Sequence, residues 1–318
     1  MQVAIMGSGG IGGYIGARLA EAGEDVAFIG RGAHLEAMRT EGLQLESPLG
    51  NMTLRQVTAT EAPSDIGFVD VVVFAVKLYD VENAAAAVVP LVGPQTRLLA
   101  FQNGIDSIDM LARFVPRSQI AGGAAYVSVH LAAPGRIVHR GGVTRFKVGG
   151  QGDTTIERLR GVCDRAVGID LQTVQDVDQL LWTKFVTLCA FSGATSLMRA
   201  GIGPILADPE ARTFIEQLRD EGMAVATAAG YPMPDGYNEE VMWLWRTFPP
   251  DTRSSMTIDF ERGKPTELAW LSGRLRALGD ELGVPTPAHT AVYRALHLHA
   301  GGSELPRLVW PDALEETK

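Results

Sequence analysis

A single lysine in an apolar stretch is the residue of this sequence that most needs a chemical explanation. Lys184 follows Leu180-Leu181-Trp182-Thr183, and no other charged residue occurs before Arg199. In a helix, Lys184, Leu188 and Ser192 would share one face. An ammonium group in such a place can stabilise a developing oxyanion and donate a proton to it. The alternative is a lysine whose long side chain reaches the surface from an amphipathic helix.

A glycine-rich turn near the amino terminus has the pattern that binds dinucleotide phosphates. Gly7-Ser8-Gly9-Gly10-Ile11-Gly12 fits G-x-G-x-x-G and lies between a predicted strand and a predicted helix. In this motif Gly7 permits the tight turn, Gly9 lets a pyrophosphate approach the backbone, and Gly12 allows close packing of helix on strand. A merely flexible turn is the alternative, and the strand–turn–helix context argues against it.

The residue after the second predicted strand bears on which dinucleotide binds. NAD sites usually carry Asp or Glu there, whereas this chain has Gly30-Arg31-Gly32. The guanidinium of Arg31 can pair with a 2′-phosphate, so we predict NADPH as the cofactor. A solvated arginine in a turn is the alternative.

Three further polar residues follow later strands. Lys77, Gln102 and Asn103 are placed at the carboxyl edge of the predicted sheet, where doubly wound folds bind ligands. We predict that they contact the cofactor. For Lys77 a surface lysine is an equal alternative, and Asn103, which precedes Gly104, could instead form a turn.

Alternating strands and helices predict a doubly wound, mainly parallel α/β domain of the Rossmann type over residues 1–175. The helix after the glycine turn continues to about Gly23, and the others are Ala33–Thr40, Val81–Val89, Ile108–Phe114 and Ile156–Val167. The predicted strands are Gln2–Met6, Val26–Ile29, Val69–Val76, Leu98–Phe101, Ala124–His130, Arg136–His139, Arg145–Val148 and Ile169–Val174. From Val177 helical patterns dominate, which predicts an all-α domain over residues 176–318.

Composition narrows the classes of protein. The chain has 318 residues, 46% hydrophobic and 20% charged, with a net charge of −9. That charge argues against a general affinity for nucleic acid or for an anionic membrane. Two cysteines, Cys163 and Cys189, are too few for a disulfide framework, and no histidine spacing suggests a metal site. The first apolar run is too short for a signal peptide or a membrane span, so we predict a cytoplasmic protein.

A last group of residues completes a recognisable set. Ser254-Ser255-Met256 is followed by Asp259, Gly263 and Glu267. Together with the glycine turn, Asn103 and Trp182-x-Lys184, these residues make the chain resemble the ketopantoate reductase family, the 2-dehydropantoate 2-reductases, over nearly its whole length. The resemblance implies NADPH-dependent reduction of a 2-keto acid to a 2-hydroxy acid, in a cleft between a Rossmann domain and a helical domain, and a place in pantothenate biosynthesis.

The resemblance also implies roles for individual residues. Lys184 matches the catalytic lysine, Asn103 the cleft asparagine, Ser255 a substrate-contacting serine and Glu267 the glutamate of the C-terminal domain, while Arg31 and Lys77 match basic cofactor contacts. Glu267 could keep the lysine charged, contact the cofactor, or be a solvated helix residue. Ser255 could bind substrate or cap a helix, and Ser254 competes for either task.

The sequence departs from the family pattern on the helix that carries the lysine. The family typically has asparagines four and eight residues later, where this chain has Leu188 and Ser192, and Ala200-Gly201-Ile202-Gly203 replaces a further asparagine. Losing such polar contacts weakens discrimination in favour of a hydroxylated substrate. We therefore expect a more apolar or bulkier 2-keto acid at Leu188 and Ser192. An NAD(P)-dependent D-2-hydroxy acid dehydrogenase and a non-catalytic dinucleotide sensor are the alternatives. The apolar Trp243-Leu244-Trp245 could line the cleft, form a homodimer contact or pack in the core, and core packing is the commoner use of such residues.

Overall fold

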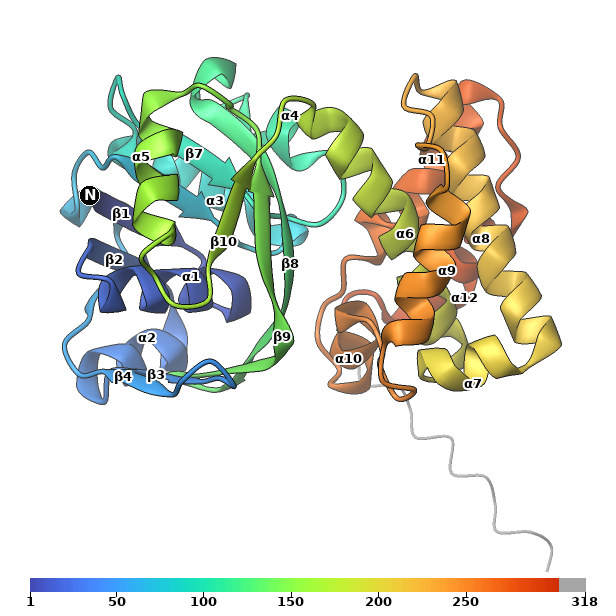
Figure 1. The fold of residues 1–318 in the computed structure, drawn as a ribbon, viewed down its shortest axis with the longest axis horizontal. Helices are drawn as coiled ribbons and strands as arrows, with labels where there is room; N and C mark the ends of the chain where they lie inside the picture. Colours follow the sequence, from blue (N-terminus) through green and yellow to red (C-terminus); the bar gives the residue numbers. More distant parts are fainter. Residues whose placement is uncertain (303–318) are drawn as a thin grey trace, which may run out of the picture. The chain divides into compact units, whose positions relative to one another are not determined.

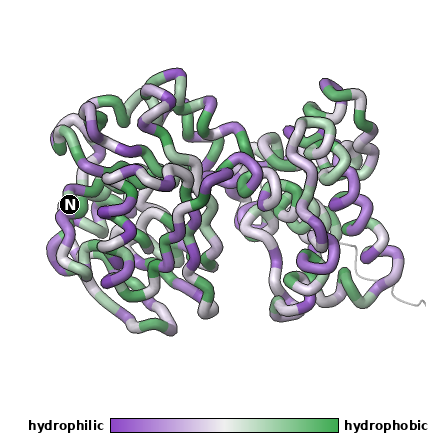
Figure 2. The backbone as a smooth tube through the Cα atoms, turned by 45° about the horizontal axis from the view of Figure 1, so that its top comes forward, coloured by the Kyte–Doolittle hydropathy of each residue, from purple (hydrophilic) through white to green (hydrophobic). Residues whose placement is uncertain are grey.

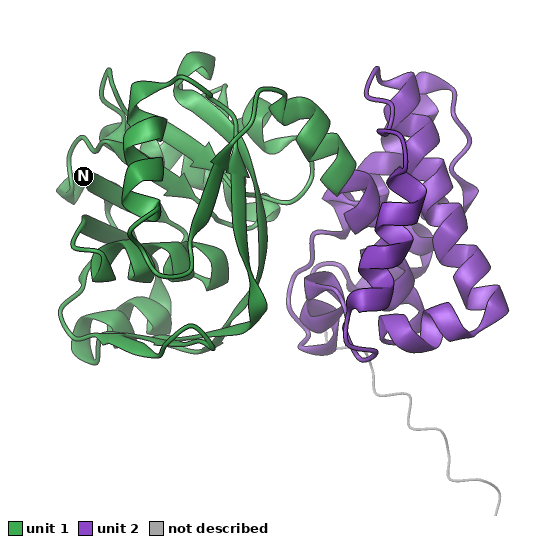
Figure 3. Cartoon of the chain, in the orientation of Figure 1, with its two compact units in different colours: residues 1–184 green, residues 185–318 purple. Residues whose placement is uncertain are grey.

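The computed structural model describes residues 1–302 and divides the chain into two compact units, residues 1–184 and 185–318 (Figure 3). The helix that starts at Val177 begins in the first unit and continues into the second. The sequence-based boundary near residue 175 lies just before this helix. Residues 303–318 of the predicted helical domain lie outside the described residues.

Unit 1 is built on one twisted sheet with the order β4-β3-β9-β8-β7-β6-β1-β2-β5, in which β10 also pairs with β9 (Figure 1). Within residues 1–302 its pairings are parallel except for β3 with β4 and β8 with β9. The predicted mainly parallel Rossmann sheet is therefore confirmed. The strands are β1 Gln2–Met6, β2 Asp25–Ile29, β3 Leu43–Glu46, β4 Met52–Leu54, β5 Thr58–Thr60, β6 Val71–Phe74, β7 Arg97–Ala100, β8 Ile120–Ala133, β9 Arg136–Val148 and β10 Asp170–Thr173.

Burial explains the central strands. All four residues of β6 are buried, because a strand in the middle of a parallel sheet is covered on both faces. The helices of this unit are α1 Gly10–Glu21, α2 Gly32–Thr40, α3 Val81–Val88, α4 Ser107–Leu111 and α5 Thr154–Cys163. On α1, Tyr14, Ile15 and Leu19 join the core formed with the sheet. The predicted helix Ile156–Val167 thus begins earlier and ends at Cys163.

The long β8–β9 hairpin differs from the sequence-based prediction. Arg136–His139 and Arg145–Val148 were expected as separate strands, but they belong to one strand, β9. Its pairing with β8 shifts between Val127 and Ser128, opposite the Arg140–Thr144 segment, where Gly141 has a φ of +80°. An irregularity of this kind lets a strand pass through a polar, glycine-containing segment without ending.

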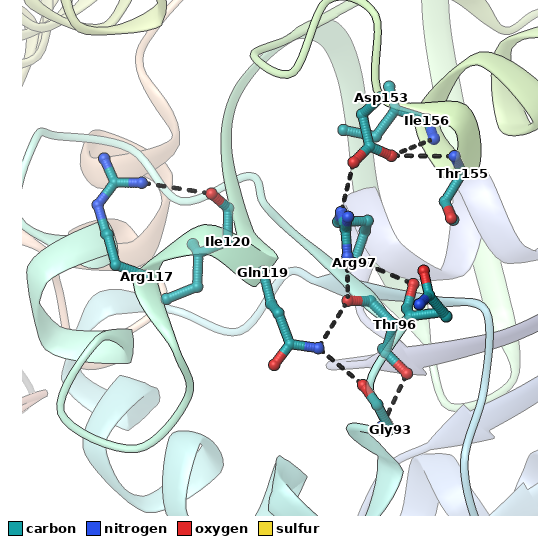
Figure 4. Close-up of polar contacts among 10 residues, drawn as sticks. Gly93, Thr96, Arg97, Arg117, Gln119, Ile120, Asp153, Thr155 and Ile156 are labelled. Atoms are coloured by element: carbon teal, nitrogen blue, oxygen red, sulfur yellow. Dashed lines mark hydrogen bonds and ion pairs between the residues drawn. The ribbon is translucent and has the colours of Figure 1, made fainter.

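The amino ends of β7 and α5 are joined by a polar network (Figure 4). Nε of Arg97 lies 2.6 Å from Oδ2 of Asp153, whose other oxygen caps α5 by accepting from the amides of Thr155 and Ile156. Burial opposes ionisation of Asp153, but these amides and the guanidinium outweigh it and hold the pKa of the carboxyl below its usual value. The network stabilises the edge of the sheet opposite the glycine-rich turn.

Unit 2 is helical, which confirms the predicted all-α domain. Its helices are the continuation of α6 Val177–Met198, then α7 Ile202–Ala207, α8 Pro209–Ala228, α9 Tyr237–Thr247, α10 Ser255–Glu261, α11 Ser272–Leu282 and α12 Pro287–Leu296. The carboxylate of Glu221 on α8 caps α12, accepting from the amides of Ala288 at 2.7 Å and His289 at 3.0 Å. The fully buried His289 ring lies 2.9 Å from the carbonyl of Leu218, so α8 and α12 are joined at two points.

Helix α6 is apolar enough, over its 22 residues, to satisfy the length and composition of a membrane span. However, 67% of its most apolar window is buried inside the protein, as in the core helix of a soluble protein. Apolar and polar residues are interspersed along both units (Figure 2).

Candidate active site

The glycine-rich turn joins β1 to α1, and each of its three motif glycines has a different surrounding. Gly7 has a φ of +97°, and a Cβ added there would lie 2.7 Å from the amide nitrogen of Val76. A Cβ on Gly12 would lie 2.2 Å from the carbonyl oxygen of Gly7. A Cβ on Gly9, in contrast, would meet nothing within 4 Å. Packing therefore requires glycine at the first and third positions, whereas at the second only an approaching ligand would.

The turn is fixed to the end of β2. The amides of Gly7 and Ser8, both at 3.3 Å, and the hydroxyl of Ser8 at 3.2 Å donate to the carbonyl of Ile29. The Ser8 side chain is thereby buried and directed into the fold. At the start of α1, the amides of Gly10 and Ile11 have no acceptor within the helix, and the helix dipole favours a negative charge there. The turn therefore fits the pyrophosphate of a dinucleotide.

His34 supports this turn, and the sequence analysis did not identify it. The amide of Gly135 in the β8–β9 turn donates to Nδ1 at 2.9 Å, so Nε2 carries the proton and donates to the carbonyl of Ser8 at 2.8 Å. Burial lowers the pKa of His34, although the Ser8 carbonyl opposes this shift. The neutral ring links α2, the glycine-rich turn and the hairpin. No local motif marks such a histidine, because its partners are distant in sequence.

Arg31 lies at the N-cap position of α2, with 74% of its side chain exposed. Its Nη2 lies 2.8 Å from Oδ2 of Asp80, which precedes α3. Asp80 was also absent from the sequence-based candidates. The amide of Asp80 donates to the carbonyl of Lys77 at 2.9 Å, so Lys77 and Asp80 belong to one turn.

Lys77, Gln102 and Asn103 follow the ends of adjacent strands, as the sequence predicts. Val76, next to Lys77, contacts the glycine-rich turn at Gly7. The buried amide of Gln102 donates to the carbonyls of Phe74 at 2.9 Å and Val76 at 3.1 Å, so its Nε2 stabilises the end of β6. Its Oε1 is buried and finds no hydrogen-bond partner within residues 1–302. Whether these three residues contact a cofactor stays a prediction.

The ammonium of Lys184 lies 5.5 Å from the centre of the Tyr126 ring, in a cation–π arrangement. Tyr126 comes from β8 and is a further residue that sequence reasoning missed. The same strand reaches the glycine-rich turn, because a Cβ on Gly10 would lie 2.9 Å from the carbonyl oxygen of Val129. One strand of unit 1 thus borders both the turn and the lysine.

The remaining candidates lie in unit 2. Leu188 is half-buried, and Ser192 is fully buried with its hydroxyl 3.5 Å from the carbonyl of Cys189. Ser254 is the N-cap of α10 and accepts from the amide of Thr257 at 3.1 Å, which leaves Ser255 exposed in the first turn. Glu267 is only 4% exposed, at the N-cap position of a short 3-10 turn. Their substrate and catalytic roles remain predictions.

The described part of the chain, residues 1–302, holds no group of three or more His, Cys, Asp or Glu side chains arranged to bind a metal ion. Both cysteines, Cys163 and Cys189, are buried and unbridged, and burial raises the pKa of the Cys163 thiol to about 12. Thiolate chemistry is therefore disfavoured at Cys163.

Comparison with known proteins places the chain within one family. The family described as "Ketopantoate reductase PanE/ApbA" matches residues 3–152, and its C-terminal counterpart matches residues 176–300. A 2-dehydropantoate 2-reductase of Archaeoglobus fulgidus is 30% identical over 289 residues, which cover 89% of this chain and 92% of the relative. The structure of a PanE/ApbA family ketopantoate reductase from Ralstonia eutropha is similar, with a TM-score of 0.87 and 29% identity over 94% of this chain and 98% of that one.

An enzyme with a different name has a similar fold. D-mandelate dehydrogenase, in a ternary structure with NADH and anilino(oxo)acetate, matches 94% of this chain and 98% of its own with a TM-score of 0.84. At 20% identity, this likeness concerns the fold alone.

Proposed function

The chain belongs to the PanE/ApbA ketopantoate reductase family, and we propose that it reduces a 2-keto acid to the 2-hydroxy acid with NADPH as the hydride donor. The observation that carries the proposal is the double contact of β8, with the glycine-rich turn at Val129 and with Lys184 through Tyr126. Tyr126 and Val129 are three positions apart along the strand, which corresponds to about 10 Å. That separation is comparable with the reach of a nicotinamide riboside from its pyrophosphate.

In this proposal the chain supplies charge and protons. Bound NADPH would supply the hydride for the keto carbon, and the chain would have to stabilise the negative charge that develops on the keto oxygen. The Lys184 ammonium donates a hydrogen bond to that oxygen and then transfers its proton to it. The cation–π contact with the Tyr126 ring holds the ammonium in position. Asn103 supplies a neutral donor, Glu267 keeps the ammonium charged or contacts the cofactor, and Ser255 binds the substrate.

Residues of unit 1 provide the proposed cofactor contacts. The amides at the start of α1 receive the pyrophosphate above Gly9, where the backbone is uncovered. Arg31 and Lys77 receive the 2′-phosphate, which is the basis for proposing NADPH rather than NADH. We also propose that the protein acts in the cytoplasm.

The substrate is proposed to be more apolar than ketopantoate. Ser192 is fully buried with its hydroxyl directed to its own helix, and Leu188 offers no hydrogen bond at all. A site without such donors discriminates poorly in favour of a hydroxylated acid, but it accepts an apolar chain.

The test is a turnover assay that follows the loss of NADPH absorbance with ketopantoate and a panel of apolar 2-keto acids. Lys184→Ala should lower kcat by about two to four orders of magnitude, the usual contribution of a general acid, without changing the Kd of NADPH. Lys264→Ala, which removes an exposed lysine, is the matched control and should be silent.

Three results would contradict the proposal in different ways. A kcat of Lys184→Ala within threefold of the wild type would exclude Lys184 as the acid. A clear preference for ketopantoate would refute the proposed apolar substrate. Oxidation of 2-hydroxy acids that is much faster than any reduction would favour a D-2-hydroxy acid dehydrogenase.

A further inference from the structure

Asp80 occupies a helix-capping position without acting as a cap. It immediately precedes α3, yet its carboxylate accepts no hydrogen bond from the first turn of that helix. Asp153 and Asp208, at the same position before α5 and α8, do accept such bonds. Asp80 differs from these two residues in having a helical backbone, and it ends the 3-10 turn Leu78–Asp80 that leads directly into α3, so the start of α3 does not use its carboxylate as a cap.

The carboxylate is instead directed to Arg31. Oδ2 of Asp80 lies 2.8 Å from Nη2 of Arg31, and 26% of the Asp80 side chain is exposed. Arg31 follows β2 and Asp80 follows β6, and β1 lies between these strands in the sheet. The ion pair therefore spans the carboxyl end of β1, where the glycine-rich turn begins.

The local charges make Asp80 a competitor of a phosphate. Arg31 and Lys77 contribute two positive charges at this edge, and Asp80 contributes one negative charge. A guanidinium has five N–H donors in a fork, so Arg31 can receive a phosphate while it remains bonded to Asp80. The carboxylate and the phosphate would then lie on the same guanidinium and repel each other.

From this arrangement we propose that Asp80 sets the selectivity between NADPH and NADH by restraining the binding of the 2′-phosphate to Arg31. The inference rests on the proposed cofactor site and specifies its regulation. Asp80 weakens NADPH binding selectively, because NADH carries a hydroxyl, and no charge, at the 2′ position. Its carboxylate thereby keeps the cofactor exchangeable.

The experiment compares the Kd values of NADPH and NADH, measured by titration calorimetry on the wild type and on Asp80→Asn. The substitution keeps the shape of the side chain and removes its charge, and no capping bond is lost. NADPH should bind about three to ten times more tightly to Asp80→Asn, while the Kd of NADH should change less than twofold. The gain should shrink in high salt, because the exposed Arg31 side chain lets salt ions screen these charges.

Glu82→Gln is the matched control. Glu82 lies in the first turn of α3 and pairs with Arg113 at 2.8 Å, so its removal changes the net charge equally without touching Arg31. Both Kd values of this variant should match the wild type. An equal gain for NADPH in Glu82→Gln and Asp80→Asn would assign the effect to net charge and overturn the inference.

Two further outcomes would overturn it. An unchanged ratio of the two Kd values in Asp80→Asn, or weaker NADPH binding, would show that Asp80 does not oppose the phosphate, while the cofactor site itself would stand. Failure of the wild type to bind either dinucleotide would overturn the cofactor site and this inference together.

Discussion

Alanine substitutions at two glycines of the turn should separate folding from cofactor binding. Gly12→Ala places a Cβ 2.2 Å from the carbonyl oxygen of Gly7 and 2.9 Å from Cγ2 of Ile5. A backbone oxygen cannot move away cheaply, and overpacking of this kind costs typically about 1–3 kcal/mol. The helix propensity of alanine returns at most about 1 kcal/mol.

Gly9→Ala should behave in the opposite way. Its Cβ would meet no protein atom within 4 Å, so the stability of the variant should stay close to that of the wild type. The methyl group would, however, occupy the space through which a pyrophosphate reaches the amides of α1. We expect the Kd of NADPH to rise at least about tenfold, which corresponds to about 1.4 kcal/mol.

Thermal denaturation and calorimetric titration with NADPH measure the two effects. The difference, a net destabilisation of about 1 kcal/mol in Gly12→Ala, should lower the Tm by roughly 2–4 °C for a unit of this size. Gly161→Ala is the matched control, since a Cβ at Gly161 on α5 also meets nothing within 4 Å and lies away from the turn. Unaltered NADPH binding by Gly9→Ala, or unaltered stability of Gly12→Ala, would refute the corresponding part of this reasoning.

Two other predictions concern buried and half-buried groups outside the turn. Burial lowers the pKa of His289 to about 4, so the unfolded chain binds more protons between pH 6.5 and 4 and stability should fall by about 3 kcal/mol as the pH decreases across that range. Glu221 opposes part of this loss of stability, because burial raises the pKa of its carboxyl. Urea titrations at both pH values should therefore compare the wild type with two variants. The loss of stability should be about 3 kcal/mol smaller in His289→Gln and unchanged in His297→Gln, which replaces an exposed histidine. Equal pH dependence in the wild type and His289→Gln would contradict the assignment. The last prediction concerns Tyr126, whose ring faces the Lys184 ammonium. The kcat should fall about three- to tenfold in Tyr126→Leu and stay near the wild-type value in Tyr126→Phe, since only the phenylalanine keeps the cation–π contact. An equal kcat in the two variants would show that the ring face does not assist Lys184.

The central strands could be predicted because their signal is local. A run such as Val71–Phe74 is apolar throughout, and only a strand buried on both faces requires that pattern. The three short strands β3, β4 and β5 lack such a run. They hold three or four residues each, with mixed exposure, and their pairing with the sheet fixes them more than their own composition does.

The same difference between local and long-range signals explains which parts of the candidate site could be predicted. The roles of Gly7, Gly9 and Gly12 follow from the order of residues within one turn, so the motif indicates them directly. Asp80 is 49 residues from its partner Arg31, and Gly135 is 101 residues from His34. Contacts over such separations depend on strand order, because β1 lies between β2 and β6 and because the β8–β9 hairpin reaches back to α2. A single sequence does not specify these neighbours.

The charge of the whole chain explains why the phosphate groups need such local contacts. A net charge of −9 repels a dinucleotide at long range, and this repulsion is screened beyond about 10 Å at moderate ionic strength. Binding must therefore come from short-range donors, and the proposed ones are the amides at the start of α1 and the cations Arg31 and Lys77. An acid that neutralises one of two such cations alters a large share of the favourable charge at this edge. In our proposal this is why a single half-buried carboxylate, Asp80, can determine which dinucleotide is preferred, although an ion pair with an exposed partner such as Arg31 contributes little to the stability of the fold.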